Sequence, residues 1–241
     1  MAATITPVRT LAAATAPLDV VSEDLYRDIH KGIRGELFAL TCAAGNVDPS
    51  DHDAVEVVGR RWGTLADMLT QHAAHEETFV RPVIEVVDRE LADALTSEHV
   101  AIEDVIGTLR GLADDASAAR GDARRLASHR LYLGLASFTA TFLEHEELEE
   151  TVVMPALAAK VPVDELVAVH QAIVASIPPD EMAFGLSLML PALNVEERVE
   201  LLGGIRAGAP AEVFAGVLAL AQSVLAPEVY AQTAQCLGLL S

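Results

Sequence analysis

Residues 72–82 read HAAHEETFVRP and residues 145–155 read HEELEETVVMP, so one pattern occurs twice in the chain. Both copies follow His-x3-Glu-Glu-x4-Pro, and both lie in stretches with helical apolar spacing. Residues four apart project from one face of an α-helix, so the histidine and the first glutamate of each copy point the same way. One turn separates them by about 5.4 Å along the axis. The imidazole can hold one cation while the carboxylate reaches a second, which predicts a two-metal site where two such faces meet.

Two further histidines share their surroundings. His30 and His99 are each followed by apolar residues at helical spacing, and each precedes one copy of the repeated pattern. His30 and His99 are 69 positions apart, while His72 and His145 are 73 apart, so the two halves are nearly in register. The sequence therefore predicts an all-α fold. We expect an antiparallel up-down four-helix bundle with approximate two-fold symmetry, in which each helix sends one histidine inward.

Metal ligation must be weighed against simple packing, because a single histidine on an apolar helix face is more often a core or surface residue than a ligand. Here the packing interpretation requires four matched histidines and two buried glutamates to arise by coincidence. Burying carboxylates without a cation is costly. We therefore favour metal ligation. The predicted ligands are His30, His72, Glu76, His99, His145 and Glu149.

The repeat also separates ligands from their neighbours. Leu148 occupies the place of His75 in the second copy and cannot bind a metal, so the repeat selects His72 and leaves His75 in the core or behind the ligands. Other histidines have no counterpart in the opposite half, and we expect them to be structural: His52, His129 and His170.

Several glutamates lie close to the predicted ligands. Glu77 and Glu150 sit about 100° around the helix from them, so we expect these two to be solvated or bound to a helix neighbour. Two more glutamates are additional candidate ligands, one four residues after His99 and one adjacent to His145. They are Glu103 and Glu146.

The donor set indicates the metal. Four imidazoles with two carboxylates suit iron better than magnesium or calcium, which prefer oxygen ligands throughout. Structural zinc sites usually draw on cysteine, and one zinc ion would leave ligands unused. No histidine has a glutamate three positions before it, which argues against the ferritin-like di-iron proteins. The chain has no His-Glu-x-x-His either, so the zinc metalloprotease interpretation fails.

With these motifs, residues 22–160 resemble the hemerythrin-like (HHE cation-binding) domain family. That family has an antiparallel four-helix bundle around a non-haem di-iron centre. The resemblance implies two iron ions with an oxo or hydroxo bridge. The family order of one His, then His-x3-Glu, then His, then His-x3-Glu or His-x4-Asp matches this chain at His30, at His72 with Glu76, at His99, and at His145 with Glu149.

The chain departs from the oxygen-carrying hemerythrins at two places. Those carriers have His-x3-His on the third helix, where this chain has Glu103 as the second position, and the fourth helix here has His-x3-Glu in place of His-x4-Asp. Without the fifth histidine, a coordination position is open or differently filled. We therefore expect a di-iron protein that binds or activates O2 or peroxide in redox or oxidative-stress chemistry. As an enzyme it would be a di-iron oxidoreductase. The alternative is a carrier or sensor of O2, NO or iron without turnover.

Composition limits the partners. The formal net charge of −20 argues against nucleic acid and anionic membrane surfaces, which repel such a field. The two cysteines are too few for a disulfide framework, and we expect a cytoplasmic protein. No uninterrupted apolar run reaches the roughly 18–20 residues needed to cross a bilayer. Hydrophobic residues make up 51% of the chain, which is ample for a core.

Turn signals divide the chain into three parts: an N-terminal arm over 1–21, the four-helix bundle over 22–160 and a helical extension over 163–241. We expect the bundle helices over 22–44, from 51 to a kink or end at Pro82, over 90–112, and up to Pro155, with a polar loop over 114–122.

Proline residues divide the extension into short helical runs. Asn194 followed by Glu197 predicts a capped helix start, and residues 211–225 are apolar on most sides and should be buried. The extension has no cluster of ligand-type residues. It could pack as a helical subdomain, cover one end of the bundle as a lid, or form a homodimer interface, and the sequence leaves these alternatives open.

Overall fold

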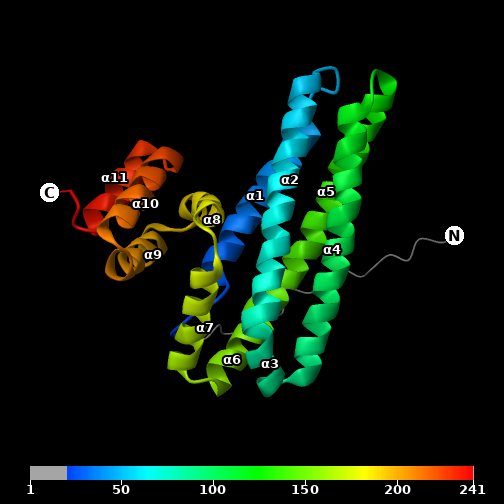
Figure 1. The fold of residues 1–241 in the computed structure, drawn as a ribbon. Coiled ribbons are helices and arrows are strands. Elements are labelled where there is room, and N and C mark those ends of the chain that lie inside the picture. The colour runs from blue at the N-terminus through cyan, green and yellow to red at the C-terminus, as the bar shows by residue number, and fades with distance from the viewer. Residues whose placement is uncertain (1–20, 241) are drawn as a thin grey trace.

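The computed structural model describes residues 21–240, and over this range every regular element is a helix. The all-α prediction is therefore confirmed. The predicted N-terminal arm lies outside the described residues except for Val21. Four long helices run antiparallel beside one another, and the C-terminal helices lie along one side of them (Figure 1). The long helices are α1 (Arg27–Asn46), α2 (His52–His75), α4 (Arg89–Ala118) and α5 (Asp122–Leu148).

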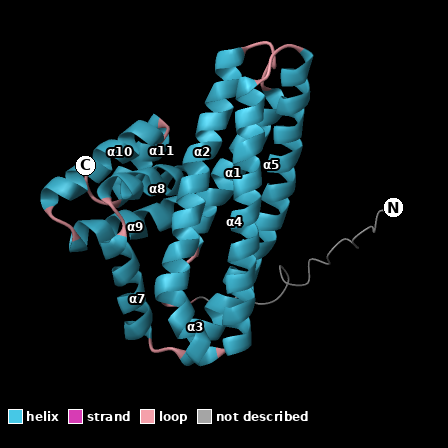
Figure 2. Ribbon diagram, turned by 45° about the vertical axis from the view of Figure 1, so that its right-hand side comes forward, coloured by secondary structure: helices cyan, strands magenta, loops and turns pink. Residues whose placement is uncertain are grey.

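The four long helices bury an apolar core over most of their length. Trp62 is completely buried, and its ring meets that of Phe138 edge-on at 5.4 Å between centroids. Leu40 and Leu65 are also fully buried within the same cluster. These contacts join α1 and α2 to α5, as expected for the predicted four-helix bundle (Figure 2).

The first helix begins later than the sequence predicts. Residues 22–26 form bends and irregular backbone, and the α-helix starts at Arg27. The carboxylate of Asp24 accepts hydrogen bonds from the backbone amides of Tyr26 and Arg27, each at 3.0 Å. These two amides would otherwise be unsatisfied at the helix N-terminus. Asp24 thus sets the start of α1 and fixes the backbone beside Tyr26.

The third long helix is longer than predicted. Asp114 and Asp115 suggest a loop, but α4 continues to Ala118 because Ala113 and Ala116 extend its buried stripe. The loop to α5 is reduced to residues 119–121. Gly121 has a φ of 56° there, a conformation that favours glycine.

The two repeated prolines do not end their helices. Each follows a π-helical turn, over Glu76–Val80 (η2) and Glu149–Val153 (η3), and a short α-helix continues beyond it as α3 (Arg81–Val87) or α6 (Met154–Lys160). Proline lacks the amide needed for a regular helical bond, and its ring clashes with the carbonyl four residues earlier. A π turn is wider, with bonds between residues five apart. The backbone therefore absorbs each proline one turn after the predicted glutamate ligands.

The C-terminal helices pack against the bundle. Helix α7 (Val163–Ser176) contacts the η2 turn, and α8 (Pro179–Ala192) lies against α1. At Gly32 the backbones of α1 and α8 approach closely, because a Cβ atom there would lie 3.0 Å from the nitrogen of Met189. Helices α9 (Val195–Gly208), α10 (Ala211–Val224) and α11 (Pro227–Cys236) complete the region beyond α8 (Figure 1).

Ion pairs add to this contact. A guanidinium nitrogen of Arg27 on α1 lies 2.9 Å from a carboxylate oxygen of Glu200 on α9, and Lys31 pairs with Glu197. The predicted cap at Asn194 is confirmed, because its side chain accepts from the amide of Glu197 while the Glu197 carboxylate accepts from the amide of Asn194. The C-terminal region is thus joined to α1, the helix that carries His30.

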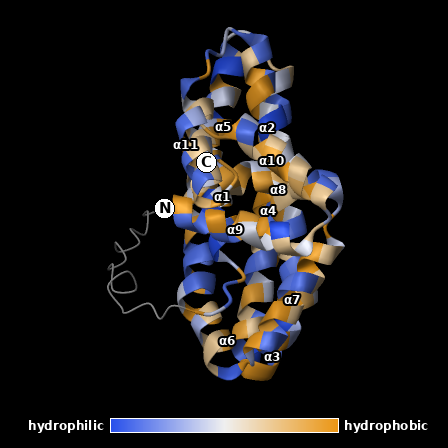
Figure 3. Ribbon diagram, turned by 90° about the vertical axis from the view of Figure 1, so that its left-hand side faces the viewer, coloured by the Kyte–Doolittle hydropathy of each residue, from blue (hydrophilic) through white to orange (hydrophobic). Residues whose placement is uncertain are grey.

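The prediction that residues 211–225 are buried is wrong. Only Phe214, Ala221 and Leu225 are buried, and Val213 is 52% exposed. Helix α10 contacts α8, α9 and α11, while its outward side stays uncovered, with more than half of the helix's residues exposed. It lies among the C-terminal helices that face the viewer in Figure 3. Over residues 21–240 no single helix is long and apolar enough to cross a membrane. Helices α7 and α8 pass the same test of length and composition only when taken together, with a bend of 117° between them.

Candidate metal centre

The structure brings all six predicted ligands into one cluster inside the bundle. Potential ligand atoms lie within 4.8 Å of one another in two groups that share Glu76. His30 is fully buried and Glu149 is 1% exposed, whereas His72 is the least enclosed of the set. One group contains His30, His72 and Glu76, and the other contains Glu76, His99, His145 and Glu149.

Glu76 faces histidines from both halves of the repeat. Its Oε1 lies 3.1 Å from Nε2 of His72, and its Oε2 lies 3.2 Å from Nε2 of His99. The one-turn offset predicted from the His-x3-Glu spacing is what allows this reach, since the histidine and the carboxylate stand at different heights on the same face. Glu76 therefore stands between the two groups of imidazoles.

Glu149 takes the matching position in the second half. Its Oε2 lies 3.4 Å from Nε2 of His30, and its Oε1 lies 3.4 Å from Nε2 of His145. The Nε2 of His99 is 3.8 Å from the same Oε1. Within the first group, Nε2 of His30 and Nε2 of His72 are 3.3 Å apart. All four imidazoles thus direct Nε2 toward the two carboxylates.

The converging atoms are poorly satisfied by one another. Within residues 21–240, both carboxylate oxygens of Glu76, Oε2 of Glu149 and Nε2 of His99 are buried without a partner in hydrogen-bonding geometry, although histidine and carboxylate atoms lie close together. Buried polar atoms of this kind are rare, and each one destabilises the folded state. Cations bound between the imidazoles and carboxylates would satisfy them. The donor set of imidazole nitrogen and carboxylate oxygen is one that iron accepts.

Burial and mutual repulsion shift the acidities of the cluster. Burial raises the pKa of Glu149 well above its usual range, and the nearby charge of Glu76 raises it further. Burial alone would lower the pKa of His99, but the carboxylates of Glu149 and Glu76 raise it to about 11. Burial lowers the pKa of His72 to about 4. Without metal, protons on Glu149 and His99 would balance the cluster, and cations can replace them.

Most of these histidines contact a further carboxylate through Nδ1, the ring nitrogen that faces away from the cluster. Glu77 lies with Oε1 2.8 Å from Nδ1 of His99, and Glu150 lies with Oε1 3.1 Å from Nδ1 of His30. We expected Glu77 and Glu150 to be solvated or bound to a helix neighbour. That is incomplete, because their imidazole partners lie on other helices. Their repetition in both copies of the pattern was the signal for this role.

Two residues of the site are missed by the sequence analysis. Glu98 lies with Oε2 2.9 Å from Nδ1 of His145, and its only signal is its position beside His99. Tyr26 is 2% exposed, and its ring centroid is 5.2 Å from that of His30. Burial raises the pKa of Tyr26 well above its usual value, and the charge of Glu149 adds to the shift. An aromatic residue four positions before a ligand histidine is its only mark in the sequence.

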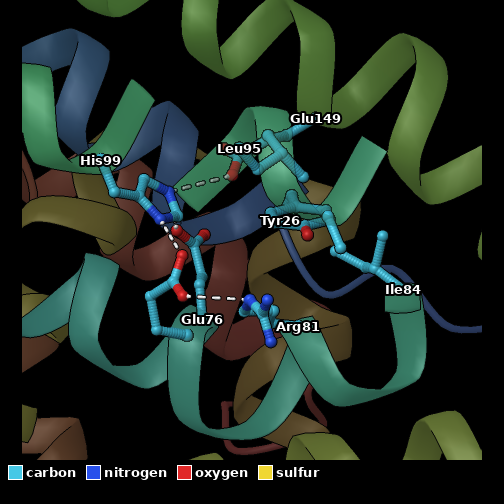
Figure 4. A pocket seen from close by; sticks show the side chains of 9 residues that line it. Tyr26, Glu76, Arg81, Ile84, Leu95, His99 and Glu149 are labelled. Atoms are coloured by element: carbon cyan, nitrogen blue, oxygen red, sulfur yellow. Dashed lines mark hydrogen bonds and ion pairs between the residues drawn. The ribbon is translucent and has the colours of Figure 1, made fainter. Parts of the chain in front are cut away.

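A small cavity adjoins the cluster on the side of Tyr26. Its wall includes Tyr26, Glu76, His99 and Glu149, with Leu95 among the apolar residues (Figure 4). It offers about 10 Å³ to the centre of a water-sized molecule. That is close to the minimum space that one water molecule requires. The cavity therefore leaves room beside the cluster for about one water-sized molecule.

The structure does not bring the two additional candidate ligands into either group. Glu103 lies on the exposed side of α4. Glu146 is fully buried, but its Oε2 lies 2.9 Å from Nε of Arg34, and burial raises its pKa to about 8. Arg34 also donates to Glu150 at 2.6 Å. Within the described residues, Glu146 and Arg34 thus belong to the surroundings of the cluster.

The remaining histidines lie apart from the cluster. His75 is half-buried against Phe79, with 6.4 Å between their ring centroids. His52 is exposed and lies 3.3 Å from Glu56, its neighbour at four residues. The other two are also exposed, one beside Tyr132 and the other paired with Glu23. They are His129 and His170.

Comparison with known proteins gives one match. The family model described as "Hemerythrin HHE cation binding domain" matches residues 21–132. The matched range contains α1, α2 and α4 with His30, His72, Glu76 and His99, and it ends within α5 before His145. Searches of curated proteins and of solved structures returned no match. The match therefore covers the first three ligand-bearing helices, and the geometry adds the fourth.

Proposed function

Because the chain carries a hemerythrin HHE cation-binding domain, we propose that its clustered ligands hold two iron ions that bind or activate O2 or hydrogen peroxide. The observation that carries this proposal is the position of Glu76 and Glu149 between imidazoles of both halves. Two carboxylates placed in this way can bridge a pair of cations. A single cation would leave one group of imidazoles without a partner.

In this proposal, each half-site takes two imidazoles and shares both carboxylates. His30 and His72 hold one ion, and His99 and His145 hold the other. Iron bound there, with the oxo or hydroxo bridge that the family resemblance implies, would supply electrons and Lewis acidity to a small oxidant. The protein residues fix the separation of the ions and exclude bulk water from the site.

The cavity supports a small oxidant as the reactant. Its space of about 10 Å³ is close to that of one water molecule, so the cavity favours a reactant of very few atoms, such as O2 or H2O2, over a larger organic substrate. Tyr26 lines this cavity, and its phenol can donate a hydrogen bond. We therefore assign Tyr26 the role of orienting the oxidant beside Glu76 and Glu149. The phenol retains its proton at neutral pH, as an ordinary tyrosine does, and burial raises its pKa further.

A second function is favoured by the same cavity. A site that admits only a very small molecule also suits reversible binding of O2 or NO, with no second reactant and no turnover. In that case the C-terminal helices, which contact α1 and η2, would transmit the ligand state.

We further propose that the outward side of α10 mediates a homodimer. Cys42 and Cys236 are free and exposed, which suits a reducing compartment such as the cytoplasm.

Stopped-flow spectroscopy of the reduced, iron-loaded chain separates these functions. We expect two irons per chain by elemental analysis, rapid oxidation by O2 without lasting reversible uptake, and consumption of added hydrogen peroxide. Tyr26→Phe should retain both irons but react more slowly with peroxide. Stable, reversible O2 uptake with no loss of peroxide would instead establish a carrier or sensor. One tightly bound zinc and no iron would refute the di-iron centre itself.

A further inference from the structure

The carboxylates that contact Nδ1 of the ligand histidines follow the two-fold symmetry of the bundle for His30 and His99. His30 on α1 contacts Glu150 in η3, and the related His99 on α4 contacts Glu77 in η2. The distances between Nδ1 and carboxylate oxygen are 3.1 Å and 2.8 Å. These two histidines are therefore held in the same way.

The symmetry breaks at the other pair. His145 on α5 has its Nδ1 2.9 Å from Glu98 on α4. The residue of α1 that corresponds to Glu98 is Ile29, because each immediately precedes the ligand histidine of its helix. Ile29 is partly buried and packs against the apolar core. Over residues 21–240, no carboxylate contacts Nδ1 of His72, whose side chain remains 14% exposed.

This difference affects metal binding. A carboxylate that accepts the second ring proton of a ligand histidine fixes the tautomer, orients the ring and strengthens the imidazole as a donor. Removing such a partner typically weakens metal binding by about 10–100-fold. His145 has this support, whereas His72 has no such carboxylate within residues 21–240. The predicted ligands are otherwise matched in residue type, with two histidines and one glutamate in each half.

We infer that the two metal positions are unequal, that the ion at His99 and His145 is held more tightly, and that Glu98 is the positioning residue responsible. The inference rests on the proposed di-iron function. It makes the ion at His30 and His72 the one that exchanges first. A chain with a limited iron supply would therefore fill the position beside Glu98 and leave the other vacant.

The first test measures binding of Fe(II) to the metal-free full chain under anaerobic conditions, against a competing chromogenic chelator. His72→Ala should lose the second equivalent of Fe(II) and keep the tight first equivalent. His145→Ala should weaken the first equivalent by about tenfold or more. Equal weakening of the first equivalent by both substitutions would overturn the inference. A wild-type chain that binds no Fe(II) would instead refute the proposed function.

The second test moves the carboxylate. In the double variant Ile29→Glu with Glu98→Ile, the preference should reverse, so that His145→Ala now spares the first equivalent and His72→Ala weakens it. Ile29→Gln with Glu98→Gln provides the uncharged control, in which the affinities of the two positions should converge. Circular dichroism checks that each variant is folded. If the exchanged variant does not fold, Glu98→Gln decides alone, because an unchanged first equivalent in that variant contradicts the inference.

Discussion

Glu76 and Glu149 are the residues on which both metal positions depend. Each presents its two oxygens to imidazoles of different halves, at distances between 3.1 and 3.4 Å for the nearest contacts. A histidine of the cluster, by contrast, directs one Nε2 toward one position. The two residue types therefore differ in how many ions their removal affects.

Substitution of either glutamate should empty the whole centre. We expect Glu76→Ala and Glu149→Ala each to reduce the iron content from two per chain toward zero, because each carboxylate is shared. His30→Ala should lose mainly one ion. Elemental analysis after gel filtration measures the content. Glu103→Ala is the matched control, since Glu103 is an exposed glutamate outside both groups and its loss should leave the iron in place. Retention of one full equivalent in Glu76→Ala would contradict shared ligation.

The metal-free protein should lose stability as the pH rises from about 7 to about 9. Glu146 has a pKa of about 8, that of Glu149 is also raised, and that of His99 is about 11. In the unfolded chain these carboxyls are already ionised and histidine is largely neutral above about pH 7. The folded state therefore holds more protons in this range, so the free energy of unfolding falls with increasing pH. The pKa of His72 is lowered to about 4, so this residue affects the free energy of unfolding only below about pH 7.

Thermal melts of the chelated protein at the two pH values test this. Glu146→Gln should show a smaller fall, because its side chain has no proton to lose. A midpoint that rises with pH would show that these groups are not protonated in the folded state. The iron-loaded protein should respond less, since the cations replace the protons of the cluster.

The six ligands could be predicted from sequence because their spacing along single helices encodes their positions. His72 and Glu76 lie one turn apart whatever the bundle does. Glu98 and Tyr26 could not be found in this way. Glu98 contacts His145 on a different helix, and the position of Tyr26 beside His30 depends on the backbone before α1. Such contacts are set by helix rotation, which spacing alone does not specify.

At the scale of elements, the π turns decide where the glutamates point. η2 carries Glu76 and Glu77, and the two side chains reach opposite sides of the same imidazole, Nε2 and Nδ1 of His99. The turn that accommodates the proline is thus also the turn that supplies both carboxylates. The sequence predicts the disturbance at Pro82 but not its form, because a helix end, a kink and a π turn all resolve the missing amide.

Arg34 joins α1 to the second ligand-bearing segment. Its Nε lies 2.9 Å from Glu146 on α5, and its Nη1 lies 2.6 Å from Glu150 in η3. We expect Arg34→Met to lower the free energy of unfolding by about 1–3 kcal/mol, because the hydrogen bond to Glu150 and the ion pair with the buried Glu146 are lost while the aliphatic stem is kept. Urea denaturation at constant pH measures the change. Arg60→Met serves as control, because Arg60 is 67% exposed and, among residues 21–240, its side chain pairs only with Glu56 on its own helix. Equal effects of both substitutions would contradict a structural role for Arg34.

For the whole molecule, the metal centre should contribute directly to stability. Among the described residues, the cluster buries polar atoms without hydrogen-bond partners inside the bundle, and a ligand that binds only the folded state stabilises it by mass action. The contribution is about 4 kcal/mol when free metal exceeds its dissociation constant about 1,000-fold. The iron-loaded chain should therefore melt well above the chelated chain at equal protein concentration. Identical melting curves would mean that the cluster does not hold the metal.

The bundle was predictable as a whole because its sequence repeats, and each half confirms the other. The C-terminal region has no such repeat. Its helix boundaries follow from proline and from the cap at Asn194, but the apolar residues of α10 surround the helix and do not indicate which side packs. The expectation of complete burial failed for that reason. The side on which a short apolar helix packs is set by its tertiary contacts, here with α8, α9 and α11. The apolar pattern of the sequence does not specify those contacts.

Gly32 lets the C-terminal helix α8 pack directly against α1, the helix that carries His30 of the metal centre. A Cβ atom at this glycine would lie 3.0 Å from the backbone nitrogen of Met189 and 3.2 Å from Cβ of Leu188, both on α8, and His30 is two residues away on α1. A methyl group at position 32 must pry the helices apart by about a few tenths of an ångström and tilt the imidazole with them. Gly32→Ala should therefore shift the visible spectrum of the iron-loaded protein without touching a ligand. Gly35→Ala should leave it unchanged, because its Cβ would meet only Ala192 at 3.9 Å. Matching spectra for the two variants would show that the contact with α8 does not affect the metal centre. A shift confined to Gly32→Ala would show that the position of α8 influences the iron.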